Sequence, residues 1–224
     1  MRYLLDLEEM EDRWVAFVPG LPGCYASDEG QATVLAGAPA AVAAYHDWQR
    51  RHGAVVPDET VETAIEEIHR AWHGTPDYEV NAFFASDREP LTADECKRLA
   101  QLLQWTRADL LTAVTGLREG ELEREVGNMW PINRILNHVA RAENWYLDRL
   151  SLAVEALAAV PAVLDRLARV RKRLLSALPA LADDDRVVAL QGELWSPRKL
   201  VRRAIWHERD HTDHIGQVRR RLAS

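Results

Sequence analysis

The chain has 224 residues, of which 47% are hydrophobic and 28% are charged, and its formal net charge at pH 7 is −7. This length and composition suit a soluble protein with one large domain or two small ones. The acidic balance excludes a general attraction to nucleic acid or to anionic lipid, so neither is expected as a partner.

The cysteines and the apolar segments indicate a cytoplasmic protein. Cys24 and Cys96 lie far apart and form no C-x-x-C motif, so neither a disulfide framework nor a thiolate zinc site is expected. The first residues, MRYLLDLEEMEDRW, are acidic and lack the apolar core of a signal peptide. The most apolar stretch, LSLAVEALAAVPAVL, is interrupted by Glu155 and Pro161 and is too short to cross a bilayer. We therefore expect a protein of the reducing cytoplasm that is not bound to a membrane.

The first half of the chain has the pattern of an α+β domain with three to four strands. The segment RYLLDLEE alternates Tyr3, Leu5 and Leu7 with other residues, which predicts a strand. Further short strands are predicted in RWVAFVP, GLPGCYASD and DYEVNAFFAS. One helix is predicted in the Ala-rich segment 29–53, where Pro39 interrupts or kinks it, and another from Thr60 to Trp72.

The second half is helical almost throughout. Thr92 is followed three residues later by Glu95, a capping box that predicts a helix start. Further helices are predicted over residues 131–150, 160–178 and 196–222, with Pro131 and Pro197 at their starts. Four amphipathic helices indicate an all-α four-helix bundle. The pattern changes near residues 86–90, so the predicted domains are 1–88 and 89–224.

The last predicted helix carries a histidine cluster in WHERDHTDHIGQV, residues 206–218. His207 and His211 are four residues apart, so their imidazoles share a helix face and can bind one cation. At about 100° per residue, His211 falls inside the apolar stripe, His207 lies at its edge and His214 lies further toward solvent. Imidazole is the commonest metal ligand, so the pair predicts a metal site; a surface cluster without a metal is the alternative.

A third ligand is expected from a facing helix. His138, in PINRILNHVARAENWYLDRL, borders an apolar stripe of Ile135, Val139, Ala142 and Tyr146. The remaining histidines belong to the first domain: His46, His52, His69 and His73. Three imidazoles leave a coordination position open, as catalytic sites do, and they suit zinc or nickel better than magnesium or calcium.

Two residues beside the predicted ligands are candidates for catalysis. Glu208 lies inside the apolar arc and should point inward, where it orients a ligand or acts as a base; a buried ion pair with an arginine is the alternative. His214 should line the mouth of the pocket and serve proton transfer or substrate orientation. HERDH also matches the zinc-peptidase motif H-E-x-x-H, but too little chain follows it to supply a third ligand and a substrate cleft.

These two segments resemble the DinB/YfiT-like superfamily of four-helix-bundle metalloenzymes, which includes bacillithiol- and mycothiol-dependent transferases. ILNHVARAENWYL is similar to the family's second helix, in which a His is followed five residues later by a Glu. WHERDHTDHI is similar to the last-helix pattern H-x-x-x-H-R-G-Q-I. The resemblance covers residues 90–224 and implies that His138, His207 and His211 are the metal ligands.

The sequence departs from that last-helix pattern at two positions. Thr212 and Asp213 replace its Arg-Gly, and His214 stands where many members have Gln. A second alignment matches HIGQV to H-R-G-Q-I, which makes His214 a ligand and pairs it with Asp210. We prefer the first alignment because it keeps both imidazoles.

Residues 1–85 resemble the HicB-like antitoxin fold. The resemblance lies in VAFVPGLPGCYASDEGQATVLAGAPAAV, which is similar to that family's strand, Gly-Cys turn and Ala-rich helix. HicB-like domains bind partners or substrates and are not catalytic. Cys24 follows a Gly in this turn, where it is either a reactive thiol or a small packed side chain.

The sequence leaves two functions open. In the first, the metal activates a thiol or a water, and the protein is a thiol S-transferase or a hydrolase acting on a small molecule. The resemblance implies a low-molecular-weight thiol as co-substrate, and a homodimer is a candidate assembly. In the second, the bundle is a metal-stabilised scaffold without turnover, and the HicB-like domain recognises a partner.

Overall fold

The computed structural model describes residues 1–56, 58, 60–75 and 78–223. Contacts within the chain define two compact units. Unit 1 comprises Met1–Glu89 and Val187–Lys199, and unit 2 comprises Pro90–Arg186 and Leu200–Ser224. The predicted order, α+β first and all-helical second, is therefore confirmed in outline. However, Val187–Lys199, from the second half of the chain, belongs to unit 1.

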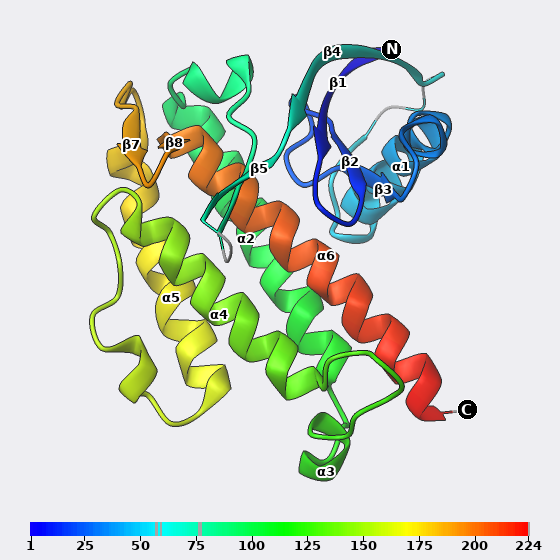
Figure 1. Cartoon of the computed structure of the whole chain (residues 1–224), viewed down its shortest axis with the longest axis vertical. Helices are drawn as coiled ribbons and strands as arrows, with labels where there is room; N and C mark the ends of the chain where they lie inside the picture. The colour runs from blue at the N-terminus through cyan, green and yellow to red at the C-terminus, as the bar shows by residue number, and fades with distance from the viewer. Residues whose placement is uncertain (57, 59, 76–77, 224) are drawn as a thin grey trace. The chain divides into compact units, whose positions relative to one another are not determined.

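Unit 1 is built on a four-stranded sheet with strand order β3-β2-β1-β4 (Figure 1). Strand β1 pairs with β2 in the antiparallel sense and with β4 in the parallel sense. Helix α1 packs on β2 and β3 through an apolar face that includes Val34, Ala38 and Val42. The strands span Arg2–Glu9 (β1), Trp14–Phe17 (β2), Tyr25–Asp28 (β3) and Glu62–Arg70 (β4), and α1 spans Gln31–Arg51.

The helix predicted from Thr60 to Trp72 is wrong, because residues 62–70 form the edge strand β4. A register shift in the pairing explains the error. Leu5 of β1 lies opposite Ile65, and Leu7 lies opposite Ile68. A step of two residues along β1 therefore corresponds to a step of three along β4. The extra residue puts both isoleucines on one face of the sheet, and a spacing of three mimics helical periodicity in the sequence.

The expected interruption of α1 at Pro39 does not occur, because the helix continues through it from Gln31 to Arg51. A proline in a helix removes one backbone hydrogen bond. Burial of α1 on both sides of Pro39, at Ala38 and Val42, offsets that loss.

Unit 1 also contains two hairpins and one short 3₁₀ helix, η1. Strand β6 covers part of the strand predicted in DYEVNAFFAS, whose residue 77 lies outside the described residues. The second hairpin, β7–β8, was not predicted; Gln191 and Gly192 at its tip both have positive φ, as a two-residue hairpin turn requires. The bounds are Trp72–Thr75 (β5), Tyr78–Val80 (β6), Ala85–Arg88 (η1), Val188–Leu190 (β7) and Glu193–Trp195 (β8).

A buried ion pair joins the β7–β8 hairpin to the rest of unit 1. The Nζ of Lys199 lies 2.6 Å from Glu193, and both side chains are fully buried. Lys199 also donates to the carbonyl of Asn81, and the hydroxyl of Tyr78 donates to Glu193. Every polar atom in these contacts belongs to unit 1, so the hairpin completes its core.

Unit 2 is the predicted helical bundle. Its four long helices run side by side in Figure 1, and they begin close to the predicted positions. The side chain of Thr92 accepts a hydrogen bond from the backbone of Glu95, which confirms the capping box, and Pro131 and Pro197 stand at helix starts. The bounds are Ala93–Val114 (α2), Ile132–Asp148 (α4), Val163–Ala177 (α5) and Pro197–Ala223 (α6); a short helix α3 spans Glu119–Leu122, and two 3₁₀ turns span Leu157–Ala159 (η2) and Leu178–Leu181 (η3).

Apolar side chains of all four long helices form one core. Its buried members are Leu110 of α2, Leu167 of α5, Ile215 and Val218 of α6, and five residues of α4 that include Ile135 and Val139. The amphipathic stripes that predicted the helices therefore face one another, which positions the inward-facing polar residues as well.

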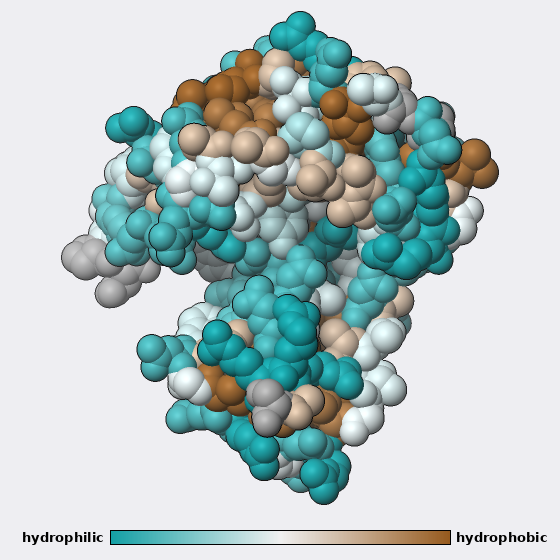
Figure 2. Space-filling view, turned by 90° about the vertical axis from the view of Figure 1, so that its right-hand side faces the viewer, coloured by the Kyte–Doolittle hydropathy of each residue, from teal (hydrophilic) through white to brown (hydrophobic). Residues whose placement is uncertain are grey.

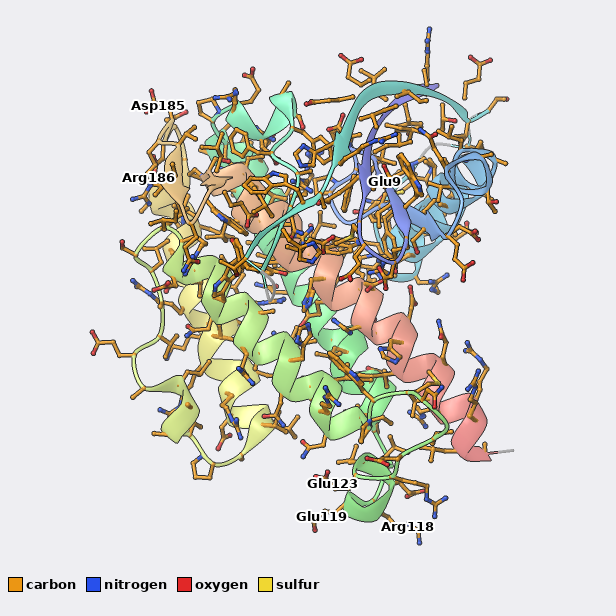
Figure 3. The ribbon with its side chains drawn as sticks, viewed as in Figure 1. Glu9, Arg118, Glu119, Glu123, Asp185 and Arg186 are labelled. Atoms are coloured by element: carbon orange, nitrogen blue, oxygen red, sulfur yellow. The ribbon has the colours of Figure 1, made fainter. Side chains whose placement is uncertain are left out.

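The face of the molecule seen in Figure 2 is mainly hydrophilic. Figure 2 shows teal residues over most of the displayed face, with smaller brown areas among them. Figure 3 labels charged side chains that project from α3 and from the segment before β7, including Arg118, Glu119 and Arg186, all of which are exposed. Within the described part of the chain, each helix is too short or too polar to cross a membrane.

Candidate metal centre

The three predicted ligands lie together in unit 2. His138 of α4 meets His207 and His211 of α6, and one ring nitrogen from each falls within 4.8 Å of the others. The Nε2 of His207 lies 3.0 Å from the Nε2 of His138 and 3.1 Å from that of His211. Among the described residues, this is the group of histidine, cysteine and acidic side chains with the geometry of a metal site.

The spacing of these nitrogens fits a cation better than a hydrogen-bond network. The Nε2 of a neutral imidazole carries either one proton or one lone pair, so the Nε2 of His207 cannot make two good hydrogen bonds at once. Nitrogens bound at about 2.1 Å to a tetrahedral zinc lie roughly 3.4 Å apart. The two observed separations are only slightly shorter, so the residues present fit a transition metal.

The depth of the ligands differs from the prediction. His207 is buried, with 8% of its surface exposed, whereas His211 is only half-buried, so the expected order is reversed. Residues 201–208 are buried all around the helix, whereas among the described residues from 209 onward only Ile215 and Val218 are buried. Depth on α6 therefore depends on position along the helix as well as on the wheel angle.

Aromatic side chains surround the histidines. The ring centroid of Tyr146 lies 5.8 Å from that of His207, and the centroid of Trp130 lies 5.3 Å from that of His138. The guanidinium of Arg134 stacks 4.2 Å from the centroid of Trp130. Burial, followed by the positive charges of Arg141 and Arg134, lowers the pKa of His138 below its usual value. A low pKa keeps the imidazole neutral, which is the form that binds a metal.

His214 lies beside the cluster and outside it. Its ring stacks on that of His211, with centroids 6.0 Å apart and an angle of 30° between the planes. The side chain is half-buried. This is the position at the edge of the site that the sequence predicted.

Glu208 points into the bundle as predicted, with 1% of its surface exposed. Its carboxylate accepts hydrogen bonds from Thr106, Arg107 and Arg171 at 2.6–2.7 Å. Burial alone would raise its pKa, but the charges of Arg171 and Arg107 and these hydrogen bonds lower it. The carboxylate is therefore a weak base held by two cations, which is the alternative that the sequence left open.

The sequence analysis missed the partners of Glu208, although a signal for them was present. Arg171 stands in the apolar stripe of Leu167, Val170 and Leu174 on α5. Arg107 interrupts the stripe of Leu103 and Leu110 on α2 in the same way. A charged residue at a core position of an amphipathic helix predicts a buried ion pair.

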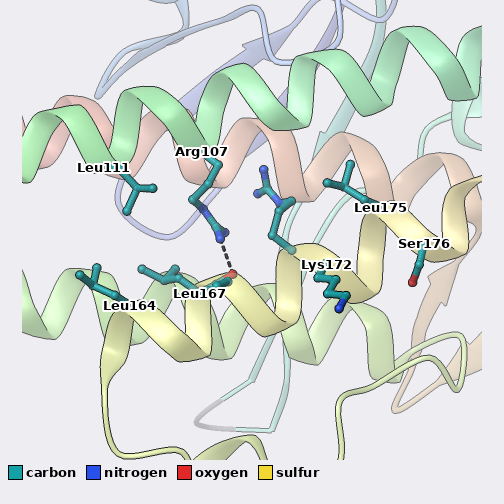
Figure 4. A pocket seen from close by; sticks show the side chains of 9 residues that line it. Arg107, Leu111, Leu164, Leu167, Lys172, Leu175 and Ser176 are labelled. Atoms are coloured by element: carbon teal, nitrogen blue, oxygen red, sulfur yellow. Dashed lines mark hydrogen bonds between the residues drawn. The ribbon is translucent and has the colours of Figure 1, made fainter.

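A groove of about 550 Å³ lies between α2 and α5, as Figure 4 shows. Its walls are apolar, and Arg107 reaches across it to donate to the backbone carbonyl of Leu167. Leu111, Leu164 and Leu175 line it, with Lys172 and Ser176 also at its surface. None of the three clustered histidines contributes to this lining, so the groove and the histidine cluster are separate features.

The cysteines and the other histidines are not part of the cluster. Cys24 and Cys96 are buried and form no disulfide, and the Sγ of Cys24 lies 3.8 Å from the carbonyl oxygen of Ala41. Cys24 is therefore a packed side chain in this structure. His46 contacts Tyr3 within unit 1.

Comparison with known proteins identifies a family. The family model for the DinB superfamily matches residues 102–215, just over half of the chain. One solved structure that the chain matches is that of YfiT from Bacillus subtilis, described as a probable metal-dependent hydrolase with an unusual four-helix bundle topology. It has 20% sequence identity and a TM-score of 0.48, and the match covers 61% of this chain and 92% of YfiT. No curated protein matches the sequence.

The matched residues 102–215 contain His138, His207 and His211, on the helices where the sequence resemblance placed them. The resemblance of residues 1–85 to HicB-like domains stays a prediction. The chain belongs to the DinB superfamily.

Proposed function

We propose that this protein is a metal-dependent enzyme whose divalent transition metal is held by His138, His207 and His211. The observation that carries the proposal is the convergence of three Nε2 atoms, at 3.0 and 3.1 Å, from helices far apart in the sequence. Zinc and nickel suit three imidazoles, and three protein ligands leave a position open for water or substrate.

When bound, such a metal lowers the pKa of a thiol or a water and so supplies a nucleophile at neutral pH. The residues of the chain then have distinct tasks. His138, His207 and His211 bind through neutral nitrogens, and Trp130 and Tyr146 surround their rings and exclude water. His214, stacked on His211, is the proposed group that accepts or donates a proton, because its side chain is only half-buried.

Glu208 is not proposed as the base. Its carboxylate is bound by two guanidinium groups and a hydroxyl, and its pKa is lowered by those charges. A base that accepts a proton near neutral pH needs a raised pKa.

The substrate class remains the one that the sequence resemblance implies: a small molecule, with a low-molecular-weight thiol as candidate co-substrate. The test is elemental analysis of the purified chain, followed by parallel assays for thiol transfer and for hydrolysis with zinc and with nickel. One metal per chain, and turnover that is lost in His207→Ala, is the expected result. A metal-free chain that takes up neither ion contradicts the proposal, and a metal-loaded chain without turnover in either assay favours the non-catalytic scaffold.

A further inference from the structure

The core of unit 2 contains four charged side chains, one from each long helix. They are Arg107 of α2, Glu143 of α4, Arg171 of α5 and Glu208 of α6, and each is at most 8% exposed. We refer to them as the Arg–Glu quartet. So many charges in one core require an explanation, because charged residues are almost never fully buried without a compensating arrangement.

Each arginine of the quartet bridges the same two carboxylates. Arg107 donates from Nε to Glu208 at 2.6 Å and from Nη2 to Glu143 at 2.8 Å. Arg171 donates from Nε to Glu143 at 2.7 Å and from Nη2 to Glu208 at 2.7 Å. The four side chains therefore form a closed ring in which Glu143 and Glu208 are linked twice.

The third nitrogen of each arginine in the ring also has a partner. The Nη1 of Arg107 donates to the carbonyl of Leu167, and the Nη1 of Arg171 donates to the carbonyl of Leu103. Thr106 adds a hydrogen bond to Glu208 at 2.6 Å. Each nitrogen of the two guanidinium groups therefore donates at least one hydrogen bond to a carboxylate or a backbone carbonyl.

Stability alone does not account for this arrangement. Apolar side chains of similar volume often stabilise a core as well as a buried ion network does, because burial removes the charges from water. The network differs from apolar packing in that its bonds restrict the relative positions of the helices. The planar fork of an arginine bonds a carboxylate only in a narrow range of positions, whereas apolar contacts are non-directional.

The two carboxylates belong to the helices that carry the histidines. Glu208 follows His207 directly on α6, and Glu143 comes five residues after His138 on α4. The double link between Glu143 and Glu208 therefore fixes the rotation and separation of α4 and α6 beside the point where the three Nε2 atoms meet. Small displacements of binding groups are costly, since a site must be held within about 0.5 Å of its working geometry.

We propose that the Arg–Glu quartet is a positioning device that holds α4 and α6 in the register at which His138 meets His207 and His211. This role rests on the proposed metal site. It makes Arg107, Glu143, Arg171 and Glu208 positioning residues, which act on the metal through the helices and do not touch it.

The test uses Co²⁺ as the probe on the full chain, because its visible spectrum reports coordination geometry and its affinity can be measured against a chelator. In the variant Arg107→Met/Glu143→Leu/Arg171→Met/Glu208→Leu, apolar side chains of similar size replace the whole network. We expect this variant to fold and to have a melting temperature no lower than that of wild type. It should bind Co²⁺ about 10- to 100-fold more weakly, which is the usual effect of removing residues that orient metal ligands, and its visible spectrum should change.

A second variant tests the same role if the quadruple variant does not fold. Arg171→Lys keeps the charge but loses the fork that bridges two carboxylates, so it should weaken Co²⁺ binding in the same direction with the helical content retained. Arg149→Met is the matched control, because Arg149 is a buried arginine of the same bundle outside the quartet. Its Co²⁺ affinity and spectrum should equal those of wild type.

The outcomes separate the two proposals. The positioning role is overturned if wild type binds Co²⁺ through three imidazoles and the folded quadruple variant binds it with the same affinity and spectrum. The metal site is then left intact. If the quadruple variant does not fold, unchanged binding in Arg171→Lys overturns it equally. A wild-type chain without a three-imidazole spectrum removes the metal site, and the positioning role with it.

Discussion

The Nε2 atoms of His138 and His207 lie 3.0 Å apart, although 69 residues separate the two histidines in the chain. His207 is also 3.1 Å from His211, so it is the central member of the cluster. This arrangement leads to direct tests of the ligand set, of the buried charges, of the response to pH and of the division into units.

Alanine at any of the three clustered histidines should abolish stoichiometric metal binding, because two imidazoles hold a divalent ion far more weakly than three. Elemental analysis of purified His138→Ala, His207→Ala and His211→Ala proteins measures this loss. His214→Gln is the control and should keep its metal while changing activity or its pH dependence. Metal loss in His214→Gln, with full metal in His138→Ala, would show that the second alignment of the last helix is the right one.

Breaking the Arg–Glu quartet on one side should destabilise the fold strongly. Glu208→Leu leaves Arg107 and Arg171 facing each other with one carboxylate between them, and removal of one partner from a buried ion network costs about 3–5 kcal/mol. Adding Arg171→Met should recover part of this loss, because the unpaired charge is then removed. Urea unfolding followed by far-UV circular dichroism gives the free energies of wild type, Glu208→Leu, Arg171→Met and the double variant. Strictly additive effects of the two substitutions would contradict a coupled network.

The metal-free protein should lose stability as the pH falls below about 6.5, the usual pKa of histidine. Burial and the nearby Arg141 and Arg134 lower the pKa of His138 in the folded chain. Between its folded pKa and 6.5, the unfolded chain therefore binds a proton at this site that the folded chain does not. The free energy of unfolding consequently rises with pH across this window.

Thermal unfolding in the presence of a chelator, from pH 5 to pH 8, measures that dependence. His138→Gln should have a flatter profile over the same range, because the neutral amide does not titrate. An identical pH dependence in both proteins would assign the effect to other groups.

A fragment of residues 89–224 should be helical and bind metal, but its β7–β8 hairpin should be unstable. The cut removes Tyr78 and Asn81, which bond Glu193 and the fully buried Lys199. Limited proteolysis followed by mass spectrometry should therefore show cleavage within residues 187–196 of the fragment and not of the full chain. Equal protection of the hairpin in both would mean that unit 1 does not hold it.

The helical part of this fold could be predicted because its signals are local. The capping box at Thr92 and the prolines at residues 131 and 197 act on the turn in which they stand, and the helices begin there. The strand β4 could not be predicted in the same way. Its identity depends on pairing with β1, more than 50 residues earlier, and on a register shift that places Ile65 and Ile68 on one face.

The candidate site shows the same division. Spacing on one helix identified His207 and His211, and the stripe on α4, together with the family resemblance, identified His138. The greater burial of His207 could not be inferred, since a helical wheel contains no information on depth along the axis. The quartet was missed because its members lie on four helices, and each looks like an isolated charge until the helices are assembled.

The β7–β8 hairpin has a consequence for the order of events on the ribosome. Unit 1 needs residues 187–199, so its first 89 residues emerge without the segment that buries Lys199 and Glu193. At roughly 5–20 residues per second, several seconds pass before that segment is synthesised. The sheet and α1 can assemble in that interval, but the core of unit 1 stays incomplete until most of the bundle has been translated. Unit 1 therefore cannot complete its core before residue 199 has been synthesised.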